Sequence, residues 1–426
     1  DGETIETIVQ KLLDPGDEIL QCYDEALHIE LLQLATLLIR HLKNQLVTHR
    51  KELIKFAWDR LKRDETTSKQ WAYVNVCRFI EAYDAPHKII LQVYVALLRA
   101  FQPEQRPLLK QALDILTPAL PKRLPPQEHK YPIWIRYTKK IIVEEGHSLP
   151  HLIHIWHFLV RHSDLFYSSR AQFVPQMVNS LNRIGMATSC LVENRKLAID
   201  LADLVMTWDA RRIEAAKNDA GGKVKDEENK DVVVKMEVEG DQKAEGGAAV
   251  AAAGDDKKRA QPDEGAEDGA PTKKAKTEAG AVATATAPGS APATGVPAGG
   301  ASGEAGAAAA AQGDDDYQPN PTMIEMVVNF LMRVALIAAE PKDTQHLSER
   351  CVKLLDRALE IWPTALLKFQ YFEKVMEKSE NGHPCNLYTG VEIINVLLDR
   401  KLSALVASNS SAIKALLKSC LHSDNA

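Results

Sequence analysis

Several features that mark common protein classes are missing from this sequence. The six cysteines form no CxxC pair and stand far apart, at Cys22, Cys77, Cys190, Cys351, Cys385 and Cys420. This spacing argues against a zinc ribbon and against a disulfide scaffold, so we expect no bound metal and a reducing compartment. No run of 18 apolar residues could span a bilayer. We therefore expect no membrane partner and no secretion.

Motifs of catalytic and nucleotide-binding sites are also missing. The sequence has no GxSxG, no P-loop, no GxGxxG and no HRD or DFG element of a kinase. No Cys/His pair carries the local signature of a nucleophile. We therefore expect a protein that is not an enzyme, with no catalytic residue and no cofactor.

Glycines and aromatic residues are unevenly distributed. The 110 residues from Arg211 to Asn320 hold 16 of the 22 glycines but only one aromatic residue, Tyr317. They contain 21 Asp and Glu against 14 Lys and Arg, whereas the rest of the chain has 37 against 38. Such a segment cannot bury enough apolar surface to offset its ordering entropy. We predict that residues 211–320, called the insert below, are disordered, low-complexity and the sole source of the net charge of −6.

Helical periodicity dominates on both sides of the insert. Apolar residues recur at intervals of three and four in three clear stripes: Leu27, Leu31, Leu34 and Leu38; Leu197, Leu201, Leu204 and Trp208; Val327, Phe330, Leu331 and Val334. No sustained alternation typical of strands competes with them. Four prolines have the position of a helix start: Pro86, Pro103, Pro150 and Pro363. We predict an all-α protein with about ten helices before the insert and about five after it.

Taken in pairs, these helices give one hairpin in roughly 40 residues, the size of HEAT or armadillo-like units. We predict an α-solenoid with one segment over residues 1–210 and its continuation over residues 321–426. A single irregular bundle is the alternative that the spacing leaves open. In a solenoid each hairpin packs only on its neighbours, which leaves a long surface suited to large protein partners.

Two basic clusters lie in the insert. They consist of Lys257, Lys258 and Arg259 and, after 13 residues of mostly acidic and small character, Lys273, Lys274 and Lys276. Extended Lys and Arg side chains can reach the acidic grooves of an import receptor. We predict a bipartite nuclear localisation signal and a nuclear protein. The alternative is a solvated segment of mixed charge.

Two lysines of the insert match the pattern apolar-Lys-x-Glu, which is similar to the acceptor site for small ubiquitin-like modifiers (SUMO). They are Lys225, in Val-Lys-Asp-Glu, and Lys235, in Val-Lys-Met-Glu. The pattern also arises by chance in sequence rich in Lys and Glu. We treat both lysines as candidate SUMO acceptors.

Two further clusters are weaker. His151, His154 and His157 recur at steps of three, but no HExxH is present, so we interpret them as helix-surface histidines beside an apolar stripe rather than as metal ligands. Basic residues gather at Lys122, Arg123, Arg136, Lys139 and Lys140. Because the chain outside the insert is nearly neutral and has no RNA-recognition motif, we expect no direct nucleic-acid binding.

Residues 131–147 and 195–213 resemble the family of transformation/transcription domain-associated proteins (TRRAP). The resemblance resumes beyond the insert at residues 327–335, 350–355 and 389–392. It implies a fragment of the HEAT-repeat region of a pseudokinase family whose kinase-like and FAT domains lie elsewhere, so no active-site residue is carried over. The resemblance also implies a nuclear scaffold and co-activator of SAGA and MYST-type histone acetyltransferase complexes in chromatin and transcription regulation. Its implied partners are acetyltransferase complex subunits and the activation domains of transcription factors.

A second reading rests on the fold alone. An importin-like or other adaptor α-solenoid would bind protein cargo with a similar stack of helices. Such receptors usually expose acidic grooves and carry no nuclear signal of their own. The basic clusters of the insert therefore favour the co-activator scaffold.

Overall fold

The computed structural model describes residues 2–62, 67–100, 106–125, 129–187, 190–238, 316–339, 342–368, 370, 384–400 and 403–421. Within these ranges the regular elements are all helices, and no strand is present. The all-α class predicted from the sequence is confirmed. Residues 1–219 and 311–426 form one compact unit, and residues 220–310 are assigned to a second.

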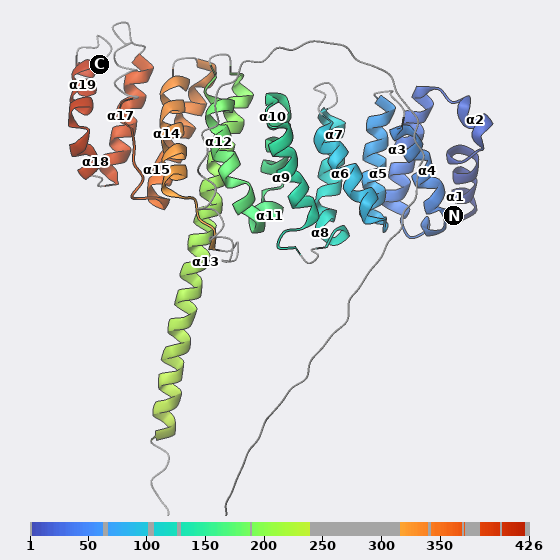
Figure 1. Cartoon of the computed structure of the whole chain (residues 1–426), viewed down its shortest axis with the longest axis horizontal. Coiled ribbons are helices and arrows are strands. Elements are labelled where there is room, and N and C mark those ends of the chain that lie inside the picture. Colours follow the sequence, from blue (N-terminus) through green and yellow to red (C-terminus); the bar gives the residue numbers. More distant parts are fainter. Residues whose placement is uncertain are drawn as a thin grey trace, which may run out of the picture. The chain divides into compact units, whose positions relative to one another are not determined.

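Helices follow one another in sequence order through the first unit (Figure 1). Before residue 239 the α-helices are α1 (Gly2–Ile8), α2 (Asp17–Gln21), α3 (Glu25–Leu42), α4 (Arg50–Leu61), α5 (Thr67–Ala82), α6 (His87–Arg99), α7 (Arg106–Leu116), α8 (Leu120–Arg123), α9 (Ile133–Glu145), α10 (Leu149–Arg161), α11 (Ser163–Phe166), α12 (Val174–Gly185) and α13 (Val192–Val238). Beyond residue 315 they are α14 (Pro321–Ala338), α15 (Gln345–Ile361), α17 (Pro384–Asp399), α18 (Ser403–Ser408) and α19 (Ser410–Leu421). Short 3-10 helices cover Val47–His49, Thr117–Ala119, Tyr167–Gln172 and Lys342–Thr344, and a π-helix covers Val9–Leu13.

The apolar stripes locate the helices and, in two of three cases, their buried faces. All four stripe residues of α14 are buried, and in α13 Leu197, Leu201 and Trp208 are buried. In α3 the phase is only partly right. Leu31 is buried and Leu34 and Leu38 pack against the core, but Leu27 is 41% exposed, and the buried face also includes His28, Leu32, Ala35 and Ile39. Leucines surround most of α3, so its sequence does not single out the stripe that faces α5.

Caps and prolines set several helix starts. Asp24 accepts a hydrogen bond from the backbone N–H of Leu27 at the start of α3, at 2.8 Å. Asn320 does the same for Met323 at the start of α14, also at 2.8 Å, and Pro321 follows it in the first turn. These two caps satisfy backbone donors that the first turn of a helix leaves without partners.

The four prolines expected at helix starts have different outcomes. Pro86 is the N-cap of α6, and Pro150 lies in the first turn of α10. Pro363 instead follows the end of α15, where residues 363–368 form a turn and an irregular stretch. Pro103 lies outside the described residues.

Neighbouring hairpins pack on one another in sequence order. Helices α3, α5 and α7 lie side by side, α4 packs on α5, and α6 packs on α9. Side-chain hydrogen bonds between hairpins recur at nearly constant separations: Asn75 to Thr36 spans 39 residues, Tyr83 to Lys43 spans 40, and Tyr94 to Thr138 spans 44. The hairpin unit of roughly 40 residues is thus confirmed as the repeat of an α-solenoid.

The apolar core is continuous through these hairpins. At its aromatic centre the ring of Phe166 meets those of Trp134, Phe158 and Phe173 edge-on, with centroids 5.4, 5.7 and 5.2 Å apart. Edge-to-face pairs at such distances stabilise beyond the apolar area that they bury. These rings join α9 and α10 to the hairpin that begins with α12.

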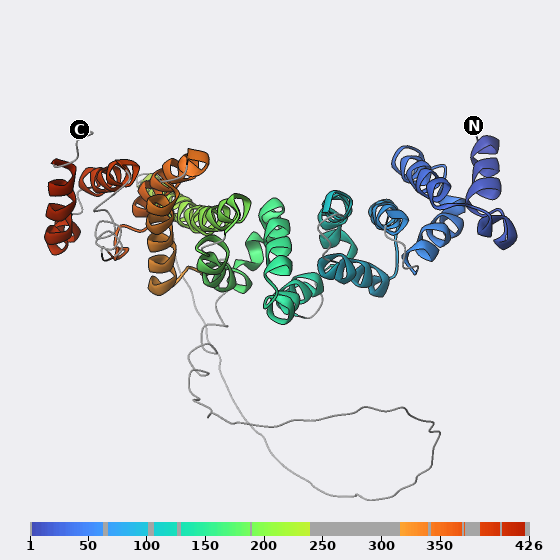
Figure 2. The ribbon, with the colours of Figure 1, turned by 90° about the horizontal axis from the view of Figure 1, so that it is seen from above.

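Helix α14 is long and apolar enough to cross a membrane by length and composition alone. However, 56% of its residues are buried inside the protein, where it packs on α12, α15 and α17. Figure 2 shows α14 and α15 beside the hairpin of α12 and α13. We therefore interpret α14 as a core helix of the solenoid.

The structure differs from the sequence prediction at both edges of the insert. Helix α13 continues past residue 210 to Val238, because its residues 211–238 include nine Lys and Glu, which favour helix, and extend a helix that is already nucleated. At the other edge Tyr317 packs against the core. Residues 239–315 lie outside the described residues.

Candidate protein-interaction site

The cross-insert joint is the place where α14 and α15 pack on α12 and α13. Arg350 of α15 donates to Asp200 at 2.6 Å and to Asp203 at 3.3 Å, and Arg357 donates to Asp203 at 2.8 Å. Asp200 and Asp203 share one face of α13 because they are three residues apart. Partial burial would lower the pKa of Arg350, but its bonds to the two aspartates raise it.

A buried carboxylate lies in the same joint. Asp209 of α13 is 4% exposed and accepts hydrogen bonds from the indole N–H of Trp362 and from Nε of Arg212, both at 2.7 Å. Burial raises the pKa of the Tyr317 hydroxyl to about 12, with a smaller opposing effect from Arg170. A buried charge that has such partners holds its neighbours in one arrangement, because loss of either partner leaves it uncompensated.

A close helix approach completes the joint. Gly185 ends α12, and a Cβ at this position would lie 2.8 Å from Cβ of Ala198 and 2.9 Å from the ring of Phe330. Its neighbours belong to α13 and α14. Glycine is therefore required here by space, since any side chain would push apart the segments that precede and follow the insert.

The sequence separations between residues that are hydrogen-bonded across this joint show how the repeat continues. Arg333 to Asn182, Arg350 to Asp200, Arg357 to Asp203 and Trp362 to Asp209 span 151, 150, 154 and 153 residues. Without the 110 residues of the insert these separations become 40 to 44 residues. The same interval separates bonded residues elsewhere in the chain. The insert thus enters between two consecutive hairpins without breaking the repeat.

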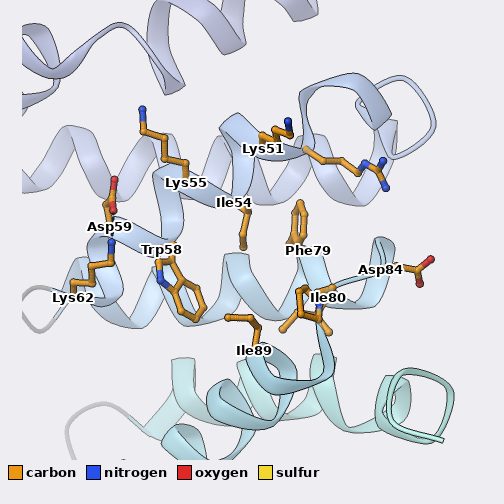
Figure 3. A pocket seen from close by; sticks show the side chains of 13 residues that line it. Lys51, Ile54, Lys55, Trp58, Asp59, Lys62, Phe79, Ile80, Asp84 and Ile89 are labelled. Carbon is orange, nitrogen blue, oxygen red and sulfur yellow. Dashed lines mark hydrogen bonds and ion pairs between the residues drawn. The ribbon is translucent and has the colours of Figure 1, made fainter. Parts of the chain in front are cut away.

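An apolar groove of about 610 Å³ lies between α4, α5 and α6 (Figure 3). Ile54 and Trp58 of α4, Phe79 and Ile80 of α5, and Ile89 of α6 form its floor. Arg50, Lys51, Lys55 and Lys62 line it together with two acidic residues, Asp59 and Asp84. This groove is not among the features predicted from the sequence, although Lys51, Ile54, Lys55, Trp58 and Lys62 follow one helix face at helical spacing.

The histidines of α10 bind backbone and carboxylate oxygens. Nε2 of His151 donates to the carbonyl of Arg99 at 3.1 Å, and Nε2 of His154 donates to that of Leu97 at 3.4 Å. Both carbonyls lie in the last turn of α6, where donors stabilise a helix. His162 bonds to Asp114 at 2.9 Å, and burial lowers its pKa while Asp114 opposes that shift. Among the described residues no group of three His, Cys, Asp or Glu could hold a metal ion.

The basic cluster around α9 is partly neutralised. Arg123 is buried and paired with Asp84, Lys139 donates to Gln172 at 2.6 Å, and Lys140 lies 3.6 Å from Glu144. Two of the five basic residues of this cluster, Arg123 and Lys140, are thus paired with carboxylates.

Two cysteines, Cys77 and Cys351, are buried in the core. Cys22, Cys77, Cys190 and Cys351 are free thiols. Burial raises the pKa values of Cys77 and Cys351, the latter to about 12. Such thiols remain protonated and unreactive at neutral pH.

The candidate modification and import residues are not described by the structure at the level of side chains. Lys225 and Lys235 belong to α13, of which only the backbone is described at these positions. The two basic clusters, Lys257, Lys258 and Arg259 and Lys273, Lys274 and Lys276, lie outside the described residues. Their roles stay predictions.

Comparison with known proteins gives a family and several relatives that are similar to this chain. The sequence matches the family "Tra1 HEAT repeat ring region" over residues 1–426. It is 38% identical over 409 residues to "Probable transcription-associated protein 1" of Dictyostelium discoideum, covering 96% of this chain and 8% of that protein. It is 29% identical over 452 residues to the human "Transformation/transcription domain-associated protein", covering 100% and 10%.

A yeast relative is similar over a shorter range. The "SAGA complex/NuA4 acetyltransferase complex subunit TRA1" of Saccharomyces cerevisiae is 34% identical over 207 residues, covering 47% of this chain and 5% of that protein. The chain thus spans about a tenth or less of the length of these relatives. Together with the repeat of helical hairpins, the match over the whole sequence shows that the chain belongs to the Tra1 family, as part of its HEAT repeat ring region.

Proposed function

We propose that this chain is a non-catalytic scaffold segment of a transcription co-activator. In this role it positions subunits of SAGA and NuA4 or MYST-type histone acetyltransferase complexes and contacts the activation domains of transcription factors. The yeast relative's name supplies the kind of complex. The observation that carries the proposal is the unbroken repeat across the insert, which gives one continuous stack of hairpins with a long surface for protein contacts.

The test is retention of acetyltransferase activity by the immobilised chain. We expect beads that carry the 426-residue chain to retain histone acetyltransferase activity from nuclear extract, with complex subunits cross-linked to α-helical surfaces of the first unit. Beads with an unrelated HEAT-repeat protein are the control. Activity no higher than on those beads would contradict the proposal.

The alternative, an importin-like adaptor, makes a different prediction about location. In the co-activator reading, Lys257, Lys258, Arg259, Lys273, Lys274 and Lys276 bind an import receptor and bring the protein to the nucleus. Alanine at all six positions should then abolish nuclear accumulation. An importin-like protein would still shuttle.

Lys225 and Lys235 are proposed SUMO acceptors, and Lys→Arg substitution at both should remove any modified form from a denaturing blot.

A further inference from the structure

The groove between α4, α5 and α6 combines an apolar floor with a cationic border. Figure 3 shows Ile54, Trp58, Phe79 and Ile89 reaching toward one space from three different helices. Ile54, Trp58 and Ile89 are only partly buried, so apolar surface stays accessible at the floor. A volume of about 610 Å³ accepts a few apolar side chains and leaves the rest of a ligand at the surface.

The charges at this border are not balanced. Asp59 lies 2.9 Å from Lys62, and Asp84 is paired with Arg123. Lys55 lies 2.9 Å from Asp14, and the pairing raises the pKa of its ammonium group. Within the described ranges, neither Arg50 nor Lys51 is paired with a carboxylate. The groove therefore has two acidic groups that are already neutralised and two cations that are not.

We propose that this groove binds an acidic amphipathic helix of a partner protein. This inference rests on the proposed function, for which it supplies one docking site. A helix presents apolar side chains at positions i, i+3, i+4 and i+7, which suits a floor built from residues of three neighbouring helices. Its acidic flanks would meet Arg50 and Lys51, so charge complementarity selects this ligand over a neutral or basic helix.

Binding is measured by fluorescence anisotropy of a labelled peptide with the full chain. The probe carries Leu and Phe at i, i+3, i+4 and i+7 and Asp and Glu at the remaining positions. Arg50→Glu with Lys51→Glu reverses the two exposed border charges that have no carboxylate partner, and we expect about tenfold weaker binding. Trp58→Ala truncates the floor and should weaken binding by a similar factor of about ten.

Two controls separate a groove from general charge attraction. Lys110→Glu changes an exposed lysine of α7 outside the groove and should leave the dissociation constant unchanged. A polyglutamate peptide of equal charge should bind at least about tenfold more weakly than the amphipathic probe. The charge variants keep the test decisive if circular dichroism shows that Trp58→Ala fails to fold.

Three results would overturn the inference. These are absence of peptide binding to the wild-type chain, equal binding by the double charge variant, and equal binding of polyglutamate. If beads with the chain retain acetyltransferase activity while the peptide fails to bind, the proposed docking site is wrong and the proposed scaffold function is still supported. If the activity is absent, the proposed function itself has failed.

Discussion

Hairpin joints within the first segment and the cross-insert joint use different chemistry. Within residues 2–187 the buried bonds between hairpins are mainly neutral, as between Tyr94 and Thr138 at 2.6 Å or Asn75 and Thr36 at 3.0 Å. Across the insert the buried bond has a charged acceptor, because the indole N–H of Trp362 donates to the carboxylate of Asp209 at 2.7 Å. Partly exposed ion pairs occur in both kinds of joint, as between Arg99 and Glu144 or between Arg350 and Asp200. The connections differ as well: a short loop joins the first hairpins, whereas a long one must be closed across the insert.

Loop-closure entropy gives the free-energy cost of the longer connection. Each doubling of loop length costs about 0.6 kcal/mol, so replacing a connection of roughly five residues by one of about a hundred costs about 3 kcal/mol. Arg350 is 34% exposed, and its ion pairs are therefore screened and worth about 1 kcal/mol or less each. Burial of α14 and the close packing at Gly185 must therefore supply most of the free energy that offsets this closure cost.

The largest expected effect is at Gly185. Gly185→Val places a branched side chain where Ala198 and Phe330 leave no room, and we expect a loss of about 3 kcal/mol of unfolding free energy from overpacking. Urea denaturation followed by circular dichroism measures it. Gly2→Ala is the control, because nothing lies within 4 Å of a Cβ there. Equal stability of both variants would mean that the helices do not meet as described.

Asp209 comes next. Asp209→Ala removes the acceptor of Trp362 and Arg212, and we expect a loss of about 2 kcal/mol because buried donors lose their partner. Asp164→Ala is the matched control, since Asp164 is 94% exposed and 3.5 Å from Arg211. Its effect should be close to zero in the same urea titration. A loss of equal size in both variants would contradict the buried role of Asp209.

Shortening the insert should stabilise the protein. Replacing residues 220–315 by a Gly/Ser linker of about 20 residues lowers the closure cost by about 1.5 kcal/mol. The midpoint of urea unfolding for the helices beyond the insert should rise accordingly. A linker as long as the original segment is the control. An unchanged or lower midpoint with the short linker would show that the insert itself stabilises the joint.

The smallest effect is a pH dependence confined to the first segment. Burial lowers the pKa of His162, so the unfolded chain binds more protons than the folded one below about pH 6.5. Stability from this group is present at pH 7.5 and is lost as the pH falls through the lowered pKa. The stability difference between wild type and His162→Gln should therefore change between pH 7.5 and 5.5. The corresponding difference for Arg350→Gln, which involves no histidine, should stay constant.

The helices and their repeat can be predicted from the sequence more fully than the contacts between the helices. Period and length predict α13 and α14 and the interval of about 40 residues. They do not predict that Arg350 faces Asp200, because that pairing depends on the relative rotation of two helices. The buried face of α3 is only partly predicted for the same reason, since its leucines fit several rotations. Tyr317 was assigned to the disordered insert because composition averages over a long stretch, whereas one aromatic ring can join a core.

Cutting the insert tests the central claim most directly. A protease site placed between residues 239 and 315 separates the chain into two pieces that only the cross-insert joint holds together. Size-exclusion chromatography with light scattering then measures the mass of the cut protein. We predict a single particle with the mass of the intact 47.2 kDa chain, which dissociates in Gly185→Val. Two separate particles from the cut wild-type protein would contradict a solenoid that continues across the insert.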